Sequence, residues 1–322
     1  MSRTARTRGT RVRRAARVRS ATLVVAAGLV AGACTQTDVP ESLPGPTTTT
    51  TEAPAAAPPA PAGCSETTVT ASLRPDGPAT GEVAAGSYMA GIQERGRLRV
   101  GVDVSTLQFS SVNPFTGEFE GFDIDIAKEV AAALLGSPDA IELVAIPYSE
   151  RLNVLTGENQ VDVVVDTFTI NCRREEEIDF SSEYFTSQQK LLVRQDDDAT
   201  GIADMAERPV CAAAGSTSID NINALPEPRP DAVPVTEQAD CLVLLQQGQV
   251  DAISTDDTIL AGMVAQDPNV RILPQGFSAE PYGIGLPPNR PEWVRYVNAV
   301  LEDVRATGRW DALYDRWLFD LM

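Results

Sequence analysis

Residues 161–181 narrow the possible folds of this chain sharply. The segment opens with Val161 and, after one residue, three further valines, a pattern typical of a strand buried on both faces of a parallel sheet. The valine run stops at Asp166, and Thr167 and Thr169 follow within three residues. Open α/β sheets bind ligands at the carboxyl ends of their strands, so these hydroxyls and the backbone N–H groups beside them are candidate ligand contacts.

Arg174 lies five residues beyond Thr169, in a segment whose three glutamates resemble the first turn of a helix. A guanidinium group can bind a carboxylate through two parallel hydrogen bonds. Arg174 is therefore a candidate clamp for a carboxylate ligand. A charged surface turn after a buried strand is the alternative explanation, and composition alone favours it until the surrounding chain is considered.

Strands and helices alternate along most of the chain. We expect strands at residues 98–102, 141–146, 161–165, 210–213, 233–235 and 251–254. We expect a short helix near residue 88 and helices at residues 121–134, 150–156, 219–224, 239–247, 257–266, 293–306 and 310–318. Such alternation predicts parallel, doubly wound sheets. Extended segments at residues 191–194 and 282–286 leave the first group of elements and return to it. We therefore predict two α/β lobes joined by two crossover strands, with a cleft between them.

These expectations divide the chain into five parts. Residues 1–33 are a signal peptide and residues 34–86 a tether rich in Thr, Pro and Ala. Residues 87–193 form the first lobe and residues 194–281 the second. Residues 282–322 return to the first lobe and end in two amphipathic helices.

The amino-terminal 33 residues have the charge pattern of an export signal. They hold eight arginines and no acid, and an apolar stretch too short to span a bilayer precedes Cys34. Residues 31–34, Ala-Gly-Ala-Cys, resemble a bacterial lipobox, in which the cysteine carries the lipid, although leucine is usual where Ala31 stands. Residues 35–63 cannot bury enough apolar surface to fold and would act as an extended tether. We expect a protein held by lipid on the outer face of the cell membrane.

Charge and residue types exclude several classes of function. The chain carries a formal charge of −19, and beyond the export signal 18 basic residues face 45 acidic ones, which argues against binding nucleic acid. The absence of histidine removes the commonest general base and the commonest zinc ligand. Ser187 and Lys190 fit the S-x-x-K pattern of penicillin-interacting enzymes, but no K-T-G follows. We expect no catalytic residue, no metal, no cofactor and a monomeric protein.

Four cysteines follow Cys34, an even number in an exported chain, so we expect disulfides. Three pairings are possible. We favour Cys211 with Cys241, which would lie within one lobe, and Cys64 with Cys172 by elimination. Free buried thiols are the alternative.

Several of these segments, in this order, resemble the bacterial extracellular solute-binding proteins of family 3, the amino-acid receptors of ABC importers. The resemblance runs from about residue 87 to the end of the chain, and similarity is greatest to actinobacterial glutamate- or glutamine-type lipoproteins, which also carry cysteines at positions like 211 and 241. It implies a type II periplasmic-binding fold whose lobes close on a free amino acid. The matching features are the Gly-Phe-Asp-Ile-Asp-Ile-Ala segment that begins residues 121–134, Asp162, Thr169, Arg174, the Ile-Asp-Phe-Ser box at 178–181, the Gly-Ser-Thr turn at 215–217 and Tyr-Gly-Ile-Gly at 282–285.

The resemblance also implies roles for individual residues. Arg174 matches the arginine that binds the ligand α-carboxylate, together with the Thr169 hydroxyl and N–H groups near Ser216 and Thr217. Asp256 matches the carboxylate that receives the α-ammonium group, although Asp257 is adjacent and either could instead cap a helix. Further positions match the side-chain end of the ligand site: Asp103, Thr106 and Tyr148, the last of which would stack on the ligand.

Two departures from the family pattern affect specificity. Ala213 and Ala214 stand where many relatives carry a lysine or arginine. Asp166 occupies a position that is usually small or uncharged, and an acid there would repel a glutamate ligand unless it is paired or protonated. Kinship to glutamate-type receptors argues the opposite way. Glutamate, glutamine, aspartate and asparagine therefore stay open as ligands, with arginine as a further candidate.

We predict an amino-acid receptor that delivers its ligand to an ABC permease, and two other functions stay open. A sensor lipoprotein would use the same lobe closure to signal to a membrane partner. An enzyme of the cyclohexadienyl dehydratase kind would need a general acid or base in the cleft, and Asp103, Asp166 or Glu150 could serve.

Overall fold

The computed structural model describes residues 64–65, 69–157 and 160–319. The predicted signal peptide, Cys34 and most of the predicted tether lie outside these residues. The helices are α1 (Tyr88–Arg95), α2 (Phe122–Leu135), η1 (Tyr148–Glu150), α3 (Asn153–Thr156), α4 (Cys172–Glu175), η2 (Ile202–Met205), α5 (Thr217–Ala224), α6 (Asp240–Gln246), α7 (Asp257–Gln266), α8 (Pro291–Ala306) and α9 (Arg309–Trp317). The strands are β1 (Leu98–Val102), β2 (Ser105–Thr106), β3 (Ser110–Val112), β4 (Phe119–Glu120), β5 (Ile141–Ala145), β6 (Val163–Val164), β7 (Asp179–Phe180), β8 (Phe185–Arg194), β9 (Pro209–Ala213), β10 (Asp231–Val235), β11 (Ala252–Asp256), β12 (Val270–Ile272), β13 (Ser278–Tyr282) and β14 (Gly285–Leu286).

The first sheet has the order β5-β1-β6-β14-β7. Strand β1 pairs in parallel with β5 and with β6, as the alternation predicts, whereas β14 runs antiparallel to β6 and β7. The strand expected at residues 161–165 is paired only over Val163–Val164, although its four valines are fully buried. Backbone hydrogen bonds from Asp162 to Arg99 and from Val165 to Gly101 continue the contact with β1 on both sides of this pair.

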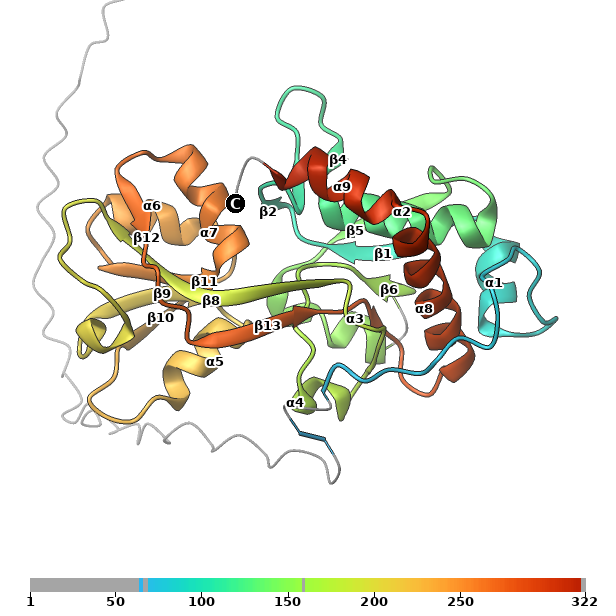
Figure 1. Ribbon diagram of the computed structural model, residues 1–322, viewed down its shortest axis with the longest axis horizontal. Coiled ribbons are helices and arrows are strands. Elements are labelled where there is room, and N and C mark those ends of the chain that lie inside the picture. Colours follow the sequence, from blue (N-terminus) through green and yellow to red (C-terminus); the bar gives the residue numbers. More distant parts are fainter. Residues whose placement is uncertain (1–63, 66–68, 158–159, 320–322) are drawn as a thin grey trace, which may run out of the picture. The chain divides into compact units, whose positions relative to one another are not determined.

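The second sheet has the order β10-β9-β11-β8-β12, with β13 also paired to β8. Strands β9, β10 and β11 are parallel, and β8 is antiparallel to β11, β12 and β13. Figure 1 shows β8 and β13 running side by side from the second sheet toward the first. Two crossover strands join the sheets, as the sequence predicts, but their positions differ: β8 is longer than the segment expected at residues 191–194, and β13 ends at Tyr282, where the segment expected at residues 282–286 begins. A three-stranded antiparallel sheet, β2-β3-β4, completes the strands described.

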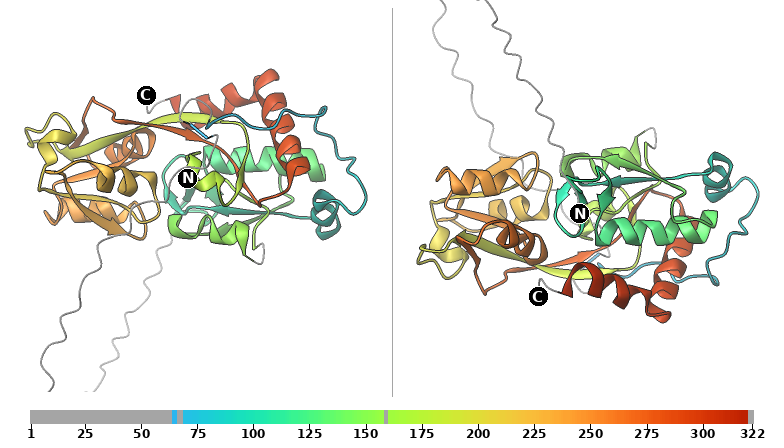
Figure 2. Two further views of the ribbon diagram at one scale, coloured as in Figure 1. Left: turned by 90° about the horizontal axis from the view of Figure 1, so that it is seen from below. Right: turned by 90° about the horizontal axis from the view of Figure 1, so that it is seen from above.

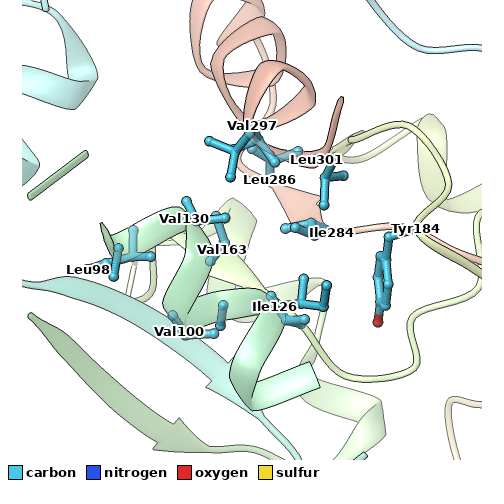
Figure 3. Packing of buried hydrophobic residues seen from close by; sticks show 14 of the residues in the cluster. Leu98, Val100, Ile126, Val130, Val163, Tyr184, Ile284, Leu286, Val297 and Leu301 are labelled. Atoms are coloured by element: carbon cyan, nitrogen blue, oxygen red, sulfur yellow. The ribbon is translucent and has the colours of Figure 1, made fainter. Parts of the chain in front are cut away.

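The largest hydrophobic core lies between the first sheet, α2 and α8. Figure 3 shows Ile126 and Val130 of α2 in this core, with Val163 of the sheet and Val297 of α8 among the residues packed with them. With Phe122, the two α2 residues have the spacing i, i+4, i+8, which puts them on one helix face, and all three are fully buried. The spacing of these residues therefore explains which face of α2 packs on the core.

Asp123 and Asp125 lie in the first turn of α2, where acidic side chains suit the positive end of a helix, but here they bind other groups. Gly121 is the N-cap residue and makes no side-chain cap. Only glycine fits here, because φ is 135° and a β-carbon would lie 2.2 Å from the Phe109 carbonyl oxygen. Asp123 is completely buried and binds groups outside the helix. Asp125 accepts hydrogen bonds from Arg316 and Trp317 of the C-terminal region. Tertiary contacts, which sequence spacing does not reveal, therefore determine what both acids bind.

The folded contacts begin earlier in the chain than residue 87. Ser72 donates a hydrogen bond to the Phe180 carbonyl, and Asn298 of α8 donates to Ser72 and to the Leu73 carbonyl. Figure 2 shows this amino-terminal segment and the C-terminal helices next to the first sheet. Among these C-terminal helices, α9 also contacts a crossover strand, because its Trp310 ring stacks on the Phe185 ring at the start of β8.

Candidate functional site

The ends of three parallel strands gather polar residues at one edge of the first sheet. Asp103 follows β1, Tyr148 begins η1 shortly after β5, and Asp166 follows β6. Because β1, β5 and β6 are parallel, their carboxyl ends share one edge, where open α/β sheets bind ligands. The structure therefore places these three candidate residues at one edge, and their role in binding a ligand stays a prediction.

A chain of hydrogen bonds joins four of the candidate residues at this edge. Thr106 donates to Oδ2 of Asp103 at 2.5 Å, and its hydroxyl lies 3.0 Å from that of Tyr148. Since the Thr106 proton is used on Asp103, Tyr148 is the donor in the second bond. The Tyr148 hydroxyl also lies 3.5 Å from that of Thr167. All four side chains are buried, so this end of the site is held in one arrangement.

Arg174 is the third residue of α4 and is buried. The side chain of Asn171 caps that helix by accepting a 2.9 Å hydrogen bond from the Arg174 N–H. Nη1 donates to the Thr169 carbonyl at 2.5 Å and Nη2 to the Gly215 carbonyl at 3.2 Å, while the guanidinium lies 4.7 Å from the centre of the Phe168 ring. Burial, with the nearby Arg151 cation as a second cause, lowers the pKa of Arg174 to about 9. A buried cation of this kind gains by binding an anion.

Arg151 is a second buried cation at this site, and sequence reasoning missed it. Its Nε donates to the Tyr148 carbonyl at 3.1 Å, Nη1 to the Asp166 carbonyl at 3.0 Å and Nη2 to the Gly215 carbonyl at 3.2 Å. The guanidinium lies 4.2 Å from the centre of the Tyr148 ring and 4.5 Å from that of Phe168. The available signal was an arginine three residues after a predicted stacking tyrosine, on one short helical segment.

Gly215 brings the turn before α5 into contact with the first-sheet elements. Its carbonyl accepts from both Arg151 and Arg174. Its φ is 78°, and a β-carbon at this position would lie 2.7 Å from the Cα atom of Ser149. Glycine is required here both for the left-handed backbone and for the close approach of two backbones.

The turn after β9 carries two of the predicted residues. The Ser216 hydroxyl caps α5 by accepting from the Ile219 N–H, and it donates to the Ala213 carbonyl, so it shapes the turn. The Thr217 hydroxyl donates to Glu280 at 2.7 Å and lies 3.5 Å from that of Thr169. Thr169 and Thr217 therefore meet across the two sheets, and Glu280, a buried acid on β13, joins the site without having been predicted.

Asp256, at the end of β11, is buried and does not act as a helix cap. It stands at the N-cap position of α7, but its side chain makes no cap hydrogen bond and instead accepts from the Tyr282 hydroxyl at 2.5 Å. Burial, and then the negative charge of Glu280, raises the pKa of Asp256 well above its ordinary value. The adjacent Asp257 binds Lys190 at 2.9 Å and Ser187 at 2.7 Å. Asp257 is therefore already paired with a lysine, whereas Asp256 is buried beside another acid and would be stabilised by a ligand cation.

Asp166 is a buried acid of the site whose side-chain oxygen atoms, in the part of the chain that the structure describes, accept no hydrogen bond. Its side chain is 1 % exposed. Burial raises the pKa of its carboxyl group well above the ordinary value, the Arg151 cation opposes that effect, and the negative charges of nearby acids add to it. Those acids are Asp103, Asp123 and Glu237.

Both favoured disulfides are present, and the alternative of free thiols is wrong for these four cysteines. The Cα atoms of Cys64 and Cys172 are 5.7 Å apart, and those of Cys211 and Cys241 are 5.6 Å apart. Cys172 is the first residue of α4. The first disulfide therefore ties the start of the described chain to the helix that carries Arg174.

Other features of the described part of the chain bear on function. Across residues 64–65, 69–157 and 160–319, no group of three or more acidic or cysteine side chains is arranged to hold a metal ion. In the same residues no helix is long and apolar enough to cross a membrane. Ser187 and Lys190 of the S-x-x-K match both bind Asp257.

Comparison with known proteins identifies relatives of this chain. Residues 98–320 match the family described as bacterial extracellular solute-binding proteins, family 3. A glutamine-binding protein of Geobacillus stearothermophilus is 40% identical over 226 residues, which are 70% of this chain and 85% of that protein. A solved structure of an ancestral arginine-binding protein bound to glutamine is 30% identical, with a TM-score of 0.65, and the match covers 70% of this chain and 98% of that one. An ancestral amino-acid-binding protein described as a precursor of cyclohexadienyl dehydratase is 29% identical, with a TM-score of 0.65 over 72% of this chain and 99% of that one.

The chain belongs to the bacterial extracellular solute-binding proteins of family 3. Its two α/β sheets joined by β8 and β13 form the type II periplasmic-binding fold that the sequence predicts.

Proposed function

We propose that this protein is an extracytoplasmic receptor that binds a free amino acid between its two sheets and delivers it to an ABC importer. The observation that carries the proposal is the opposition of buried charges: the Arg174 cation stands on the first-sheet side, and the acids Asp256 and Glu280 stand on β11 and β13. A zwitterion needs one fixed cation and one fixed anion, and each charge-assisted hydrogen bond contributes about 1.5–3 kcal/mol. Relatives named as glutamine-binding agree with this ligand class.

The direct test is a thermal-shift screen of the full-length protein against the twenty amino acids. A ligand at 100 times its dissociation constant adds about 2.7 kcal/mol to the free energy of unfolding, so one or a few amino acids should raise the melting temperature. Arg174→Ala should abolish the shift. The matched control is Arg99→Ala, because Arg99 is half-exposed and pairs only weakly with Glu142 at 3.4 Å. No shift with any amino acid would reject the proposal.

We infer further that Cys34 carries a lipid and that residues 34–63 tether the receptor to the outer face of the membrane. The lipobox-like residues 31–34 support this inference. Growth with a labelled fatty acid should label the wild-type protein and leave Cys34→Ser unlabelled. Label on the Cys34→Ser protein would reject the inference.

Two alternative functions are separated by different measurements. The first alternative is an enzyme of the cyclohexadienyl dehydratase kind, with Asp103, Asp166 or Glu150 as the general acid or base; an assay of dehydratase activity on cyclohexadienyl acids tests it. The second alternative is a sensor. Pull-down experiments with and without the ligand would then recover a membrane protein other than a permease, in an amount that depends on the ligand. We propose that the protein has no enzymatic activity, since the relatives compared are named as binding proteins.

A further inference from the structure

The carboxyl group of Asp166 is buried without a hydrogen-bond partner. Among the residues that the structure describes, neither of its side-chain oxygen atoms is paired, and the side chain is 1 % exposed. Its backbone carbonyl, in contrast, accepts from Arg151. A buried acceptor without a donor costs about 1–3 kcal/mol, so such a group in a ligand-binding site indicates that the ligand supplies the donor.

The charges that act on Asp166 come from both sides of the cleft. Arg151, Asp103 and Asp123 belong to the first-sheet side. Glu237 precedes α6 of the second-sheet side, and its pKa is raised by burial and by the neighbouring Asp103. Among these groups one cation, Arg151, therefore stands beside Asp166 and three further acids, an environment that a ligand N–H donor or cation improves and that a further carboxylate does not.

The other groups near Asp166 already have partners. Asp103 accepts from the Ser105 N–H at 3.1 Å and from the Thr106 hydroxyl at 2.5 Å. Arg151 directs one N–H at each of three backbone carbonyls and is flanked by two aromatic rings. A ligand carboxylate that paired with Arg151 would have to compete with those carbonyls and would stand beside the Asp166 carboxyl group. A ligand N–H would meet an unused acceptor.

We propose that Asp166 selects an amino acid whose side chain ends in N–H donors, either a carboxamide or a basic group, and rejects the dicarboxylic amino acids. This inference rests on the proposed function, and it chooses among the ligands that the sequence leaves open. The carboxamide and the basic group both offer N–H donors to the Asp166 carboxyl group, and they differ in charge. Glutamate and aspartate present only acceptors and bring a negative charge.

The test is calorimetric titration of the full-length protein with glutamine, asparagine, arginine, lysine, glutamate and aspartate at one salt concentration. We expect a carboxamide or a basic ligand to bind at least about tenfold more tightly than either dicarboxylic amino acid. Asp166→Ala should reduce that ratio at least about tenfold, mainly by weakening the preferred ligand. Asp139→Asn is the control and should leave the ratio unchanged, because Asp139 is exposed and precedes β5, at the end of that strand away from Tyr148.

Asp166→Asn distinguishes a carboxamide ligand from a basic one. Because asparagine is nearly isosteric with aspartate, this variant also tests the role of Asp166 if the alanine variant does not fold. An asparagine keeps one acceptor and loses the negative charge. Binding of a carboxamide should then change only a few-fold, whereas binding of a basic ligand should weaken at least about tenfold.

Tightest binding of glutamate or aspartate by the wild-type protein, or unchanged selectivity in both Asp166 variants, would overturn the inference while leaving the receptor function intact. Failure of the receptor function has a different signature: no amino acid would bind, or Arg174→Ala would bind like the wild type.

Discussion

The backbone N–H of Thr167 donates a 2.7 Å hydrogen bond to the carboxylate of Asp123. Thr167 has a φ of 41°, an unfavourable value for a β-branched residue, so the turn after β6 needs such an external support. The other oxygen of Asp123 accepts from the Tyr184 hydroxyl at 2.7 Å, just before the crossover strand β8. One buried acid thus joins a turn of the binding site to the start of a crossover.

Removal of this carboxylate should destabilise the protein. Asp123→Ala leaves the Thr167 N–H and the Tyr184 hydroxyl buried without an acceptor, and we expect a loss of about 2 kcal/mol in the free energy of unfolding, measured by urea denaturation. Asp123→Asn retains an acceptor and a donor for these groups and should lose clearly less. Equal losses in the two variants would show that the hydrogen bonds are not the cause.

The same residue makes stability depend on pH. Burial raises the pKa of Asp123 to about 7 from an ordinary value of 3.8, against the lowering effect of the Tyr184 and Thr167 hydrogen bonds. The folded state therefore holds this proton more tightly than the unfolded state. Its contribution to stability is fully present below about pH 4 and is lost as the pH rises to about 7 and above.

Urea denaturation of the wild type and of Asp123→Asn at several pH values checks this dependence. The difference in unfolding free energy between the two proteins should shift in favour of the variant as the pH rises from about 4 to 7. A difference that stays constant, or that shifts toward the wild type, would contradict the assignment.

Gly215 should be essential for the close approach between the two sides of the site. Gly215→Ala places a β-carbon 2.7 Å from Ser149 Cα, so we expect ligand binding at least about tenfold weaker by calorimetry. Gly248→Ala is a matched control, because Gly248 also has a positive φ, 68°, but has no atom within 4 Å of the new β-carbon. Both variants bear the backbone cost of about 1 kcal/mol, and only the first should lose affinity.

The two disulfides should differ in what they support. The chain-entropy account predicts the size of each effect. Replacing Cys64 and Cys172 by serine opens a loop of 108 residues and should lower the free energy of unfolding by about 4–5 kcal/mol. Replacing Cys211 and Cys241, which are 30 residues apart, should lower it by about 3–4 kcal/mol. Urea denaturation measures both. Because Cys172 begins the helix of Arg174, the first pair of substitutions should also weaken ligand binding, and the second should not. Equal effects on binding would contradict this link.

Sequence reasoning predicted several candidate site residues that the structure brings together, because their signals are local. The valine run that stops at Asp166, the arginine at 174 and the glycine-containing turn at 215 each show in a few consecutive residues. Parallel strand ends share one edge, so strands read from the sequence bring Asp103 and Asp166 together. Arg151 and Glu280 were missed because a single charged residue in a short helix or an edge segment does not reveal whether it is buried.

The sequence by itself determined the alternation of strands and helices, the amphipathic face of α2, the family and the residues that end the strands, since periodicity and turn chemistry act over a few residues. Only the tertiary structure decided what each buried charge contacts. Asp123 lies in the first turn of a helix but binds Thr167 and Tyr184, and within the described residues the Asp166 carboxyl group ends without a hydrogen-bond partner. Burial and pairing depend on segments far apart in the chain, and these properties set the charge of the site and hence the ligand it can accept.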